Sequence, residues 1–411
     1  MSDDAAVPRD GKATRGGKAI RDGGGRLDPD RVYGALADRL RGDPLSADVV
    51  AFPDGSIDYR CRAEVGAGGR SPSRRELGEG IASGERKSLR LVPERGEPGG
   101  QAVNLARGAH ALGADVALFG HLDHEAMSAL PFRTHSMGEP ASVRIVDFDD
   151  GAVMLAEESA DIRTWGFDDL LAAAPSREAA VGALAGADAV ACCNWVSFPD
   201  MPAALRTLAE RVGERRATGP PGGDDDRPVF VLDPGDVVGS DDGAIAELLS
   251  VLGALSDAYD VVLNANRREV RAVAAAVGIN GADEGAPPDP EAPADPAADD
   301  RRIAALREAA GIAGVVMHAR PRAAMATPDG VLALRNLDVG EPRRWTGGGD
   351  RFGAGLATAL GAGWRPELAL ALGNAAASRH VAETGIGGPE ALAAFVTDPE
   401  YRSDRTPGAD G

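Results

Sequence analysis

The stretch Thr346-Gly347-Gly348-Gly349-Asp350-Arg351-Phe352 is the most informative part of this sequence. The segment that follows, residues 353–360, has a pattern that predicts a helix. Three successive glycines let the backbone turn tightly and point bare N–H groups at a ligand, and a helix N-terminus adds partial positive charge there. Asp350 falls in the first helical turn, where a carboxylate can accept a proton from a hydroxyl that attacks a phosphate. A glycine-rich loop with an aspartate cap also fits, because glycine is abundant, at 54 of 411 residues.

Length and composition indicate a globular protein. The chain has 411 residues, enough for one large domain or two, and 43% of them are hydrophobic. No apolar run approaches the roughly 20 residues that span a bilayer. The acidic start Met1-Ser2-Asp3-Asp4 lacks the apolar segment of a secretory signal. We therefore expect a cytoplasmic protein that does not enter a membrane.

The charge balance is strongly acidic. Lys and Arg number 44 against 64 Asp and Glu, which gives a formal net charge of −20. This sign disfavours non-specific binding to nucleic acids and anionic membranes. Lysine occurs only at positions 12, 18 and 87, and aromatic residues make up 4% of the chain. Such a composition is typical of a high-salt cytoplasm, where salt screens the repulsion between acids. We therefore expect a halophilic source, and the negative charge says little about the substrate.

Helical and strand patterns alternate along most of the chain. Strands are expected at 48–52, 116–119, 187–193, 229–232, 261–263 and 314–317. Helices are expected at 31–40, 100–112, 201–212, 243–255, 267–276, 302–309, 350–362, 366–381 and 388–395. This alternation predicts an α/β fold, with a mainly parallel sheet covered by helices on both faces. Turn signals at Asp149-Asp150-Gly151 and Pro328-Asp329-Gly330 predict two hairpins.

The main domain is expected to span residues 46–395. Residues 1–45 are predicted to form a mobile tail followed by a short helix, and residues 396–411 a C-terminal tail.

Two kinds of segment interrupt the alternation. Parts of 55–98 and 141–160 are predicted to form a small β lid over one edge of the sheet. Residues 219–226 and 281–300 are low in complexity, and the second contains five prolines, seven acids and no base. Both low-complexity segments are predicted to be disordered.

A second glycine motif, Gly99-Gly100-Gln101-Ala102-Val103-Asn104, lies far upstream of the first. Its two glycines let the backbone approach a ligand at a helix start, and Asn104 offers a donor and an acceptor suited to sugar hydroxyls. A glycine-capped helix with a structural asparagine also fits. Asp58, just after the first predicted strand, can accept hydrogen bonds from two substrate hydroxyls.

A third motif, Asn266-Arg267-Arg268-Glu269, follows the predicted strand 261–263. Ligands of open α/β sheets bind at such carboxyl ends of strands. Asn266 and Glu269 share a helix face and can hold water on a Mg²⁺ ion near phosphates. The same spacing also fits a capping box, in which the two residues close a helix start.

In this order and spacing, these elements resemble the ribokinase-type (PfkB) family of sugar and nucleoside kinases. The first family signature is similar to Gly99-Gly100-x-x-x-Asn104-x-Ala106, and the second to Gly347-Gly348-Gly349-Asp350-x-Phe352-x-x-Gly355. The helix around Asn374 resembles the one that packs beside the adenine in that family. The resemblance covers roughly residues 46–395.

The resemblance implies a three-layer α/β/α sandwich with a β lid and a cytoplasmic kinase, with a homodimer formed through the lid. Asp350 would be the general base, and the amides of Gly347, Gly348 and Gly349 would stabilise charge on the transferring phosphoryl group. The implied acceptor-binding residues are Asp58, Gly99, Gly100 and Asn104. The implied nucleotide-binding residues are Asn266, Glu269, Thr346 and Asn374, with Glu269 acting on Mg²⁺ through water.

The sequence departs from the family pattern at three places. Arg344-Trp345 stands before Thr346, where many members carry an aspartate that supports a monovalent-cation site. His318-Ala319-Arg320-Pro321-Arg322 replaces the usual glycine-containing nucleotide loop and resembles a segment of ADP-dependent sugar kinases. The stretch between Asp58 and Gly99 is long, which predicts an enlarged lid.

The leading hypothesis is a Mg²⁺-dependent kinase that transfers a phosphoryl group from a nucleotide, ATP first, to a hydroxyl of a sugar or related polyol. ADP as the donor and a nucleoside as the acceptor are alternatives with the same site. A non-catalytic sugar-binding regulatory protein on the same fold is the alternative from another class; the intact Gly-Gly-Gly-Asp motif argues against it, and the altered nucleotide loop argues mildly for it.

Overall fold

A computed structural model of the chain describes residues 27–42, 45–65, 69, 71–218, 227–279, 295–341, 343–344 and 346–401. The predicted tail up to residue 26, the low-complexity loop 219–226 and residues 281–294 of the acidic insert lie outside the described residues, as does Trp345.

In the described residues, nine strands form the main sheet in the order β14-β13-β12-β11-β10-β9-β1-β5-β6. Their bounds are β1 Asp48–Phe52, β5 Asp115–Gly120, β6 Arg133–Ser136, β9 Ala189–Cys193, β10 Val229–Asp233, β11 Asp260–Asn266, β12 Gly314–His318, β13 Arg322–Thr327 and β14 Gly330–Arg335. The seven strands from β6 to β12 pair in parallel, and β13 and β14 add an antiparallel edge. The strand ends that carry the site therefore lie along one edge of the parallel region.

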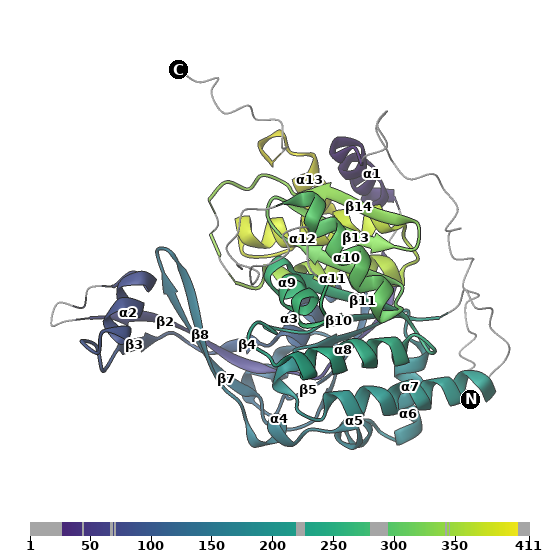
Figure 1. The fold of residues 1–411 in the computed structure, drawn as a ribbon, viewed down its shortest axis with the longest axis horizontal. Helices are drawn as coiled ribbons and strands as arrows, with labels where there is room; N and C mark the ends of the chain where they lie inside the picture. Colours follow the sequence, from purple (N-terminus) through teal and green to yellow (C-terminus); the bar gives the residue numbers. More distant parts are fainter. Residues whose placement is uncertain are drawn as a thin grey trace.

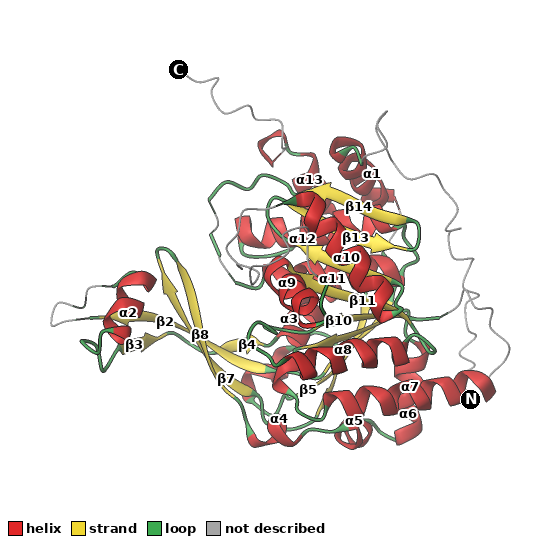
Figure 2. Cartoon of the chain, in the orientation of Figure 1, coloured by secondary structure: helices red, strands yellow, loops and turns green. Residues whose placement is uncertain are grey.

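Helices cover both faces of this sheet (Figures 1 and 2). One face carries α1 Pro29–Gly42, α3 Gln101–Ala111, α11 Gly348–Gly361, α12 Pro366–Glu383 and α13 Pro389–Thr397. The other carries α4 Ala160–Thr164, α5 Phe167–Ala173, α6 Arg177–Gly186, α7 Met201–Thr218, α8 Asp242–Leu255, α9 Arg267–Ala276 and α10 Pro296–Ala310. Successive strand residues alternate between the two cores: Val49 lies in the first and Val50 in the second. The predicted three-layer α/β/α sandwich is confirmed.

A second sheet projects from one side of the sandwich (Figure 1). Its strands are β2 Ser56–Glu64, β3 Arg90–Pro93, β4 Glu97–Gly99, β7 Ala141–Phe148 and β8 Gly151–Glu157, and α2 Arg74–Ala82 packs beside it. Cys61, Ala63, Leu77, Val146 and Phe148 give this sheet a small core of its own. It corresponds to the predicted β lid.

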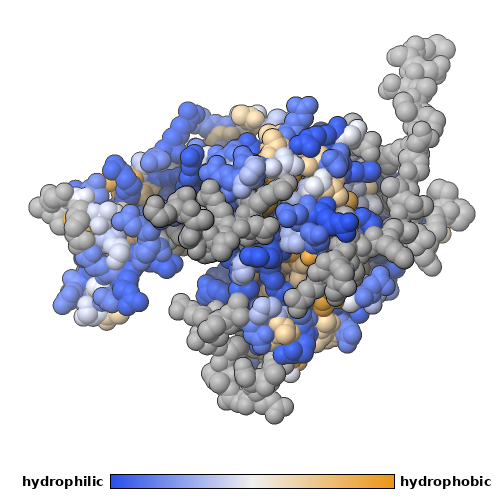
Figure 3. Space-filling model, turned by 90° about the horizontal axis from the view of Figure 1, so that it is seen from above, coloured by the Kyte–Doolittle hydropathy of each residue, from blue (hydrophilic) through white to orange (hydrophobic). Residues whose placement is uncertain are grey.

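The surface is mostly hydrophilic on the face that Figure 3 shows, as the excess of acidic residues requires. No helix in the described part of the chain combines the length and apolar character that a membrane crossing needs.

The prediction of disorder at 281–300 is wrong for residues 296–300, which begin α10. Asp295 caps this helix by accepting bonds from two backbone amides, and Pro296 occupies its first turn. The same proline and aspartate composition that suggested disorder is therefore a helix start signal. Residues 396–401, predicted as part of a tail, pack on the domain, where the rings of Phe395 and Tyr401 lie 4.3 Å apart. The patterns also missed β6 and the helices α2 and α4–α6.

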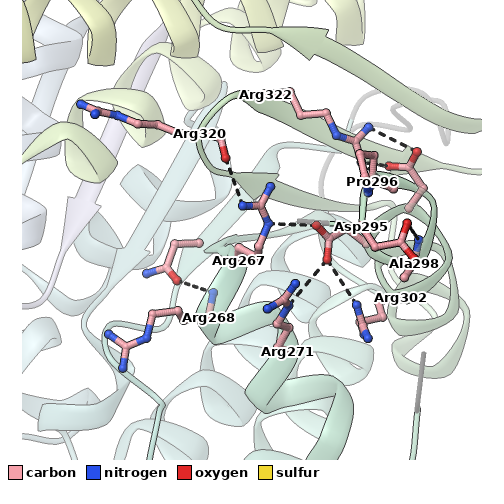
Figure 4. Close-up of polar contacts among 12 residues, drawn as sticks. Arg267, Arg268, Arg271, Asp295, Pro296, Ala298, Arg302, Arg320 and Arg322 are labelled. Atoms are coloured by element: carbon pink, nitrogen blue, oxygen red, sulfur yellow. Dashed lines mark hydrogen bonds and ion pairs between the residues drawn. The ribbon is translucent and has the colours of Figure 1, made fainter. Parts of the chain in front are cut away.

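Figure 4 shows the side chains of Arg267, Arg271 and Arg302 converging where α9 meets α10. The buried aspartate Asp299 of α10 pairs with all three. It is fully buried, and its carboxylate lies 2.9 Å from Nε of Arg267, 3.3 Å from a terminal nitrogen of Arg302 and 3.7 Å from Nε of Arg271. Arg267 also donates to the carbonyl of Arg320, in the connection between β12 and β13. This cluster therefore fixes the start of α9, which carries the Asn266–Glu269 motif.

We predict that Asp299→Asn lowers the free energy of unfolding by about 3–5 kcal/mol, because the buried guanidinium groups lose their counter-charge. Asp300→Asn is the matched control, since Asp300 pairs with Arg322 at 2.7 Å but is 32% exposed, and its loss should be about 1 kcal/mol. Denaturant unfolding at fixed salt measures both values. Equal losses for the two variants would contradict a central role for Asp299.

Candidate active site

The two glycine motifs meet at the start of α11. Gly347 precedes this helix with a left-handed φ of +82°, and Asp350 lies in its first turn. The side-chain amide of Asn104, on α3, donates to Oδ2 of Asp350 at 2.9 Å. Arg351 donates to the main-chain carbonyl of Asn104 and, at 3.3 Å, to its side-chain oxygen. The structure thus joins residues 246 positions apart and fixes the amide of Asn104 with its nitrogen toward the carboxylate.

Burial raises the pKa of Asp350 to about 7. The charge of Arg351 opposes this rise, whereas the neighbouring carboxylates of Asp233 and Asp54 add to it. A carboxylate with a pKa near neutrality is a stronger base than an exposed one and still ionises at physiological pH.

Asp54 is a site residue that the sequence patterns missed. It is buried between β1 and β2 and accepts hydrogen bonds from the backbone amides of Gln101 at 2.8 Å and Ala102 at 2.6 Å. The side-chain amide of Asn194 also donates to it, at 3.3 Å. Asp54 therefore anchors the N-terminus of α3, directly after the glycine pair. Burial raises its pKa to about 6.

Asp233 was missed as well, although it ends strand β10 at the edge where ligands bind. The side chains of Gln101 and Asn264 each donate to it at 3.2 Å, and burial raises its pKa to about 6. Nδ1 of His318 lies 3.2 Å from the side-chain oxygen of Asn264. Burial lowers the pKa of His318 to about 4, so this ring is neutral at neutral pH. A chain of polar side chains thus runs beneath the glycine loop.

Asn266 and Glu269 form a capping box at the start of α9. The side-chain oxygen of Asn266 accepts from the amide of Glu269 at 3.1 Å, and the carboxylate of Glu269 accepts from the amide of Asn266 at 2.8 Å. Burial first, and then the charge of Asp233, raise the pKa of Glu269 to about 8. The described residues contain no cluster of three or more His, Cys, Asp or Glu side chains arranged to hold a metal ion.

Asp58 lies on β2 against the glycine pair. The hydroxyl of Ser56 donates to its carboxylate at 2.6 Å, and burial raises the pKa of Asp58. A Cβ atom at Gly99 would fall within 2.2 Å of that carboxylate, so any larger residue there would displace the Asp58 side chain. Gly100 then caps α3 with a φ of +96°. The predicted acceptor-binding residues Asp58, Gly99 and Gly100 therefore lie together.

Of the predicted nucleotide-binding residues, Thr346 lies beside the glycine loop, whereas Asn374 lies inside helix α12. Thr346 precedes the glycine loop, its hydroxyl accepts from Arg60 at 3.3 Å, and its carbonyl lies 3.2 Å from Nε2 of His380. Asn374 is buried in α12, where its amide donates to the hydroxyl of Tyr33 at 3.2 Å. That contact fastens α1 to α12, and the structure does not bring the Asn374 side chain together with the other predicted site residues.

Comparison with known proteins identifies the kind of protein that carries this site. A family model described as prokaryotic ketohexokinase matches residues 76–398. The chain belongs to the prokaryotic ketohexokinase family. It is a carbohydrate kinase of the PfkB type, as the glycine motifs predicted.

Individual relatives agree with this assignment. The chain is 28% identical over 300 residues to a ketohexokinase of the haloarchaeon Haloferax volcanii, covering 70% of this chain and 71% of the relative. An adenosine kinase from Sinorhizobium meliloti is similar in structure at 17% identity, with a TM-score of 0.59 over 84% of this chain and 97% of the other. A ribokinase from Arabidopsis thaliana, complexed with ribose and ATP, matches at 16% identity, with a TM-score of 0.59 over 86% and 99%. The ribokinase-like fold of this carbohydrate kinase is therefore confirmed.

The raised pKa of the buried Asp350 carboxyl lets us predict how the free energy of unfolding depends on pH. The folded chain binds the Asp350 proton more tightly than the unfolded chain, so this contribution to stability is complete below pH 3.8 and is lost as pH rises through about 7. The Asp350→Asn variant has no titrating carboxyl at this position. We expect the unfolding free energy of wild type to fall relative to Asp350→Asn between about pH 5 and about pH 7, by up to about 1.4 kcal/mol per unit.

Urea unfolding at constant salt across this pH range gives the difference directly. Asp168→Asn, which removes an exposed carboxyl paired with Arg177 on the surface, is the control for general charge effects. A wild-type-minus-Asp350→Asn difference that does not change with pH would contradict a raised pKa.

Proposed function

We propose that this kinase transfers the terminal phosphoryl group of ATP to a hydroxyl of a ketohexose, with Asp350 as the general base. The hydrogen bond between Asn104 and Asp350 carries this proposal, because it joins the two glycine motifs and sets a side-chain amide next to a carboxylate at a helix N-terminus. The family and the haloarchaeal relative support a ketohexose as the acceptor.

Asp350 would accept the proton of the attacking hydroxyl. Its pKa of about 7 makes it a base that works near neutrality. The backbone amides of Gly347, Gly348 and Gly349 would donate to the oxygens of the transferring phosphoryl group, where the dipole of α11 also favours negative charge. The start of α11 would thus supply both the base that accepts the proton and the amides that stabilise the charge on the phosphoryl group.

The acceptor sugar would lie between β2 and α3. The carboxylate of Asp58 would accept from sugar hydroxyls, while the glycine pair at 99–100 lets the sugar approach the backbone. Asn104 would connect acceptor binding with proton transfer, since its amide nitrogen contacts Asp350 and it lies in the first turns of α3 after Gly100. Asp54 would hold this arrangement through the first amides of α3.

Mg²⁺ and nucleotide fit the strand ends of β10, β11 and β12. Mg²⁺ prefers oxygen ligands and keeps several waters, so it is usually held by one or two carboxylates together with phosphates. Glu269 and Asp233 offer such oxygens. Burial is the main cause of their raised pKa values and a neighbouring carboxylate adds to it, so a bound cation would stabilise the ionised forms. When bound, Mg²⁺ neutralises charge on the donor phosphates. Asn266 and Thr346 would lie on the nucleotide side, whereas Asn374 would act only by packing α12.

Strand β8 supports a homodimer formed through the lid. It is the outer strand of the lid sheet, and Met154 and Leu155 on it are 62% and 52% exposed. Large apolar side chains on an open sheet edge favour pairing with a second copy.

We predict that Asp350→Asn lowers kcat by about 100- to 10,000-fold, the range for loss of a general base, while acceptor binding persists. The amide keeps the shape of the side chain but cannot accept the proton. Steady-state kinetics gives kcat, and calorimetric titration with D-fructose gives the acceptor affinity. Asp168→Asn should match wild type. A near-normal kcat for Asp350→Asn would overturn the assignment of Asp350 as the base.

The acceptor and the donor need a separate test, because the His318 segment resembles that of ADP-dependent enzymes. A coupled phosphorylation screen in high KCl should cross ATP, ADP and GTP with ketohexoses, pentoses, hexose phosphates and nucleosides. We expect the highest kcat/KM for ATP with a ketohexose. Turnover only with ADP or only with nucleosides would replace this assignment, and sugar binding without any turnover would favour a regulatory protein.

A further inference from the structure

Arg60, in the middle of β2, contacts both the lid and the glycine loop. One terminal nitrogen lies 2.7 Å from a carboxylate oxygen of Asp147 on the neighbouring lid strand β7. The other donates to the hydroxyl of Thr346 at 3.3 Å. One guanidinium group thus contacts both the lid strand β7 and Thr346, which is 286 residues away from Arg60 in sequence. Its planar fork suits this task, because it presents donors in fixed directions.

Thr346 is the residue directly before the glycines that would bind the phosphoryl group. On the side of the sandwich, its carbonyl lies 3.2 Å from Nε2 of His380. Burial first, and the charge of Arg351 next, lower the pKa of His380 to about 4, so the ring is neutral at neutral pH. A Cβ atom at Gly347 would come within 3.1 Å of the same ring nitrogen. The start of the glycine loop is therefore held by α12 from one side and by Arg60 of the lid from the other.

Stability alone does not explain this arrangement. The side chains of Arg60 and Asp147 are 25% and 41% exposed, and ion pairs of that kind contribute about 0–1 kcal/mol. The hydrogen bond to Thr346 is long, at 3.3 Å, so it also adds little to stability. What the contacts supply is a defined position of the loop relative to β2, the strand that carries Asp58.

We propose that Arg60 is a positioning residue that couples the position of the lid strand β2 to the geometry of the glycine loop. In the arrangement of this structure Arg60 contacts Thr346 and would thereby place the following amides for phosphoryl transfer. A lid movement that separates β2 from the loop would remove this restraint and let the loop relax. This inference rests on the proposed function for its effect on catalysis, and on the contacts alone for its effect on the loop.

The first test is steady-state kinetics of the full chain with ATP and D-fructose. We expect Arg60→Met and Thr346→Val to lower kcat/KM by about 10- to 100-fold, mostly through kcat, as misplacement of a reacting group does. Arg60→Lys keeps the charge but reaches only one of the two partners, so it should fall between Arg60→Met and wild type. Arg62→Met is the matched control, because Arg62 is exposed two residues further along β2, and it should stay within about twofold of wild type.

The double variant distinguishes coupling from two separate effects. If Arg60 acts through Thr346, Arg60→Met combined with Thr346→Val should be no worse than the poorer single variant. Losses that multiply would overturn the proposal, as would an Arg60→Met enzyme that behaves like Arg62→Met. Full activity of Thr346→Val together with a loss in Asp147→Asn would reduce Arg60 to a cross-strand lid contact.

Amide hydrogen exchange without substrates tests the coupling independently of activity. Arg60→Met should raise exchange in residues 56–64 and 346–350 together, with the unfolding free energy within about 1 kcal/mol of wild type. Arg62→Met should change neither segment. If wild type makes no phosphorylated product but Arg60→Met still loosens both segments, the proposed function fails and the coupling stands. If exchange at 346–350 is unchanged, the coupling fails whatever the enzyme's activity.

Discussion

The hydrogen bond between Asn104 and Asp350 depends on an unusually close approach of α3 and α11. A Cβ atom at Gly108 would lie 2.6 Å from Cβ of Ala354, so a larger side chain at this crossing would push the helices apart. On its other side, α11 meets α12 just as closely, because a Cβ atom at Gly355 would lie 2.7 Å from the carbonyl oxygen of Leu372. Small residues thus set the depth of α11 in the sandwich, and that depth decides where Asp350 lies relative to Asn104. The chemistry at the helix start is a consequence of packing one to two turns further on.

The electrostatics of the site follow from the same burial. Burial raises the pKa values of Asp54, Asp233 and Asp350; in addition, Asp54 raises the pKa of Asp233, and both raise that of Asp350. The fold supports these acids with backbone amides and side-chain amides rather than with cations, apart from Arg351 beside Asp350. Such an arrangement leaves negative charge uncompensated, which is costly in a low-dielectric interior. A metal ion or a bound donor of hydrogen bonds would lower that cost, so ligand binding and folding stability are linked through these carboxyls.

The sequence indicated those parts of the candidate site that have a local pattern. The glycines at 99–100 and 347–349 could be predicted because tight turns before helices need them, and Asp350 and Asn104 followed from their spacing to those turns. Asn266 and Glu269 allowed a capping box and a cation-binding pair alike, and the structure shows the capping contacts. Asp54 and Asp233 could not be found in this way, because a single aspartate at a strand end resembles any turn residue. The contact of Asn374 could not be predicted either, because its hydrogen-bond partner Tyr33 is 341 residues away in sequence and no local pattern indicates the pairing.

The lid and the proposed acceptor site share strand β2. The first residues of β2 pair with β4 and bring Asp58 against Gly99, while its later residues pair with β3 and contribute Cys61 and Ala63 to the lid core. The lid core is small, so the projecting sheet has far less packing to hold it than the sandwich has. A sugar that binds Asp58 would therefore order the strand on which the whole lid is built. Arg60 lies between these two parts of β2 and contacts Thr346. A shift of β2 on acceptor binding would therefore be transmitted to Thr346 and the glycine loop. Acceptor recognition and preparation of the phosphoryl site would then be one event, because one strand takes part in both.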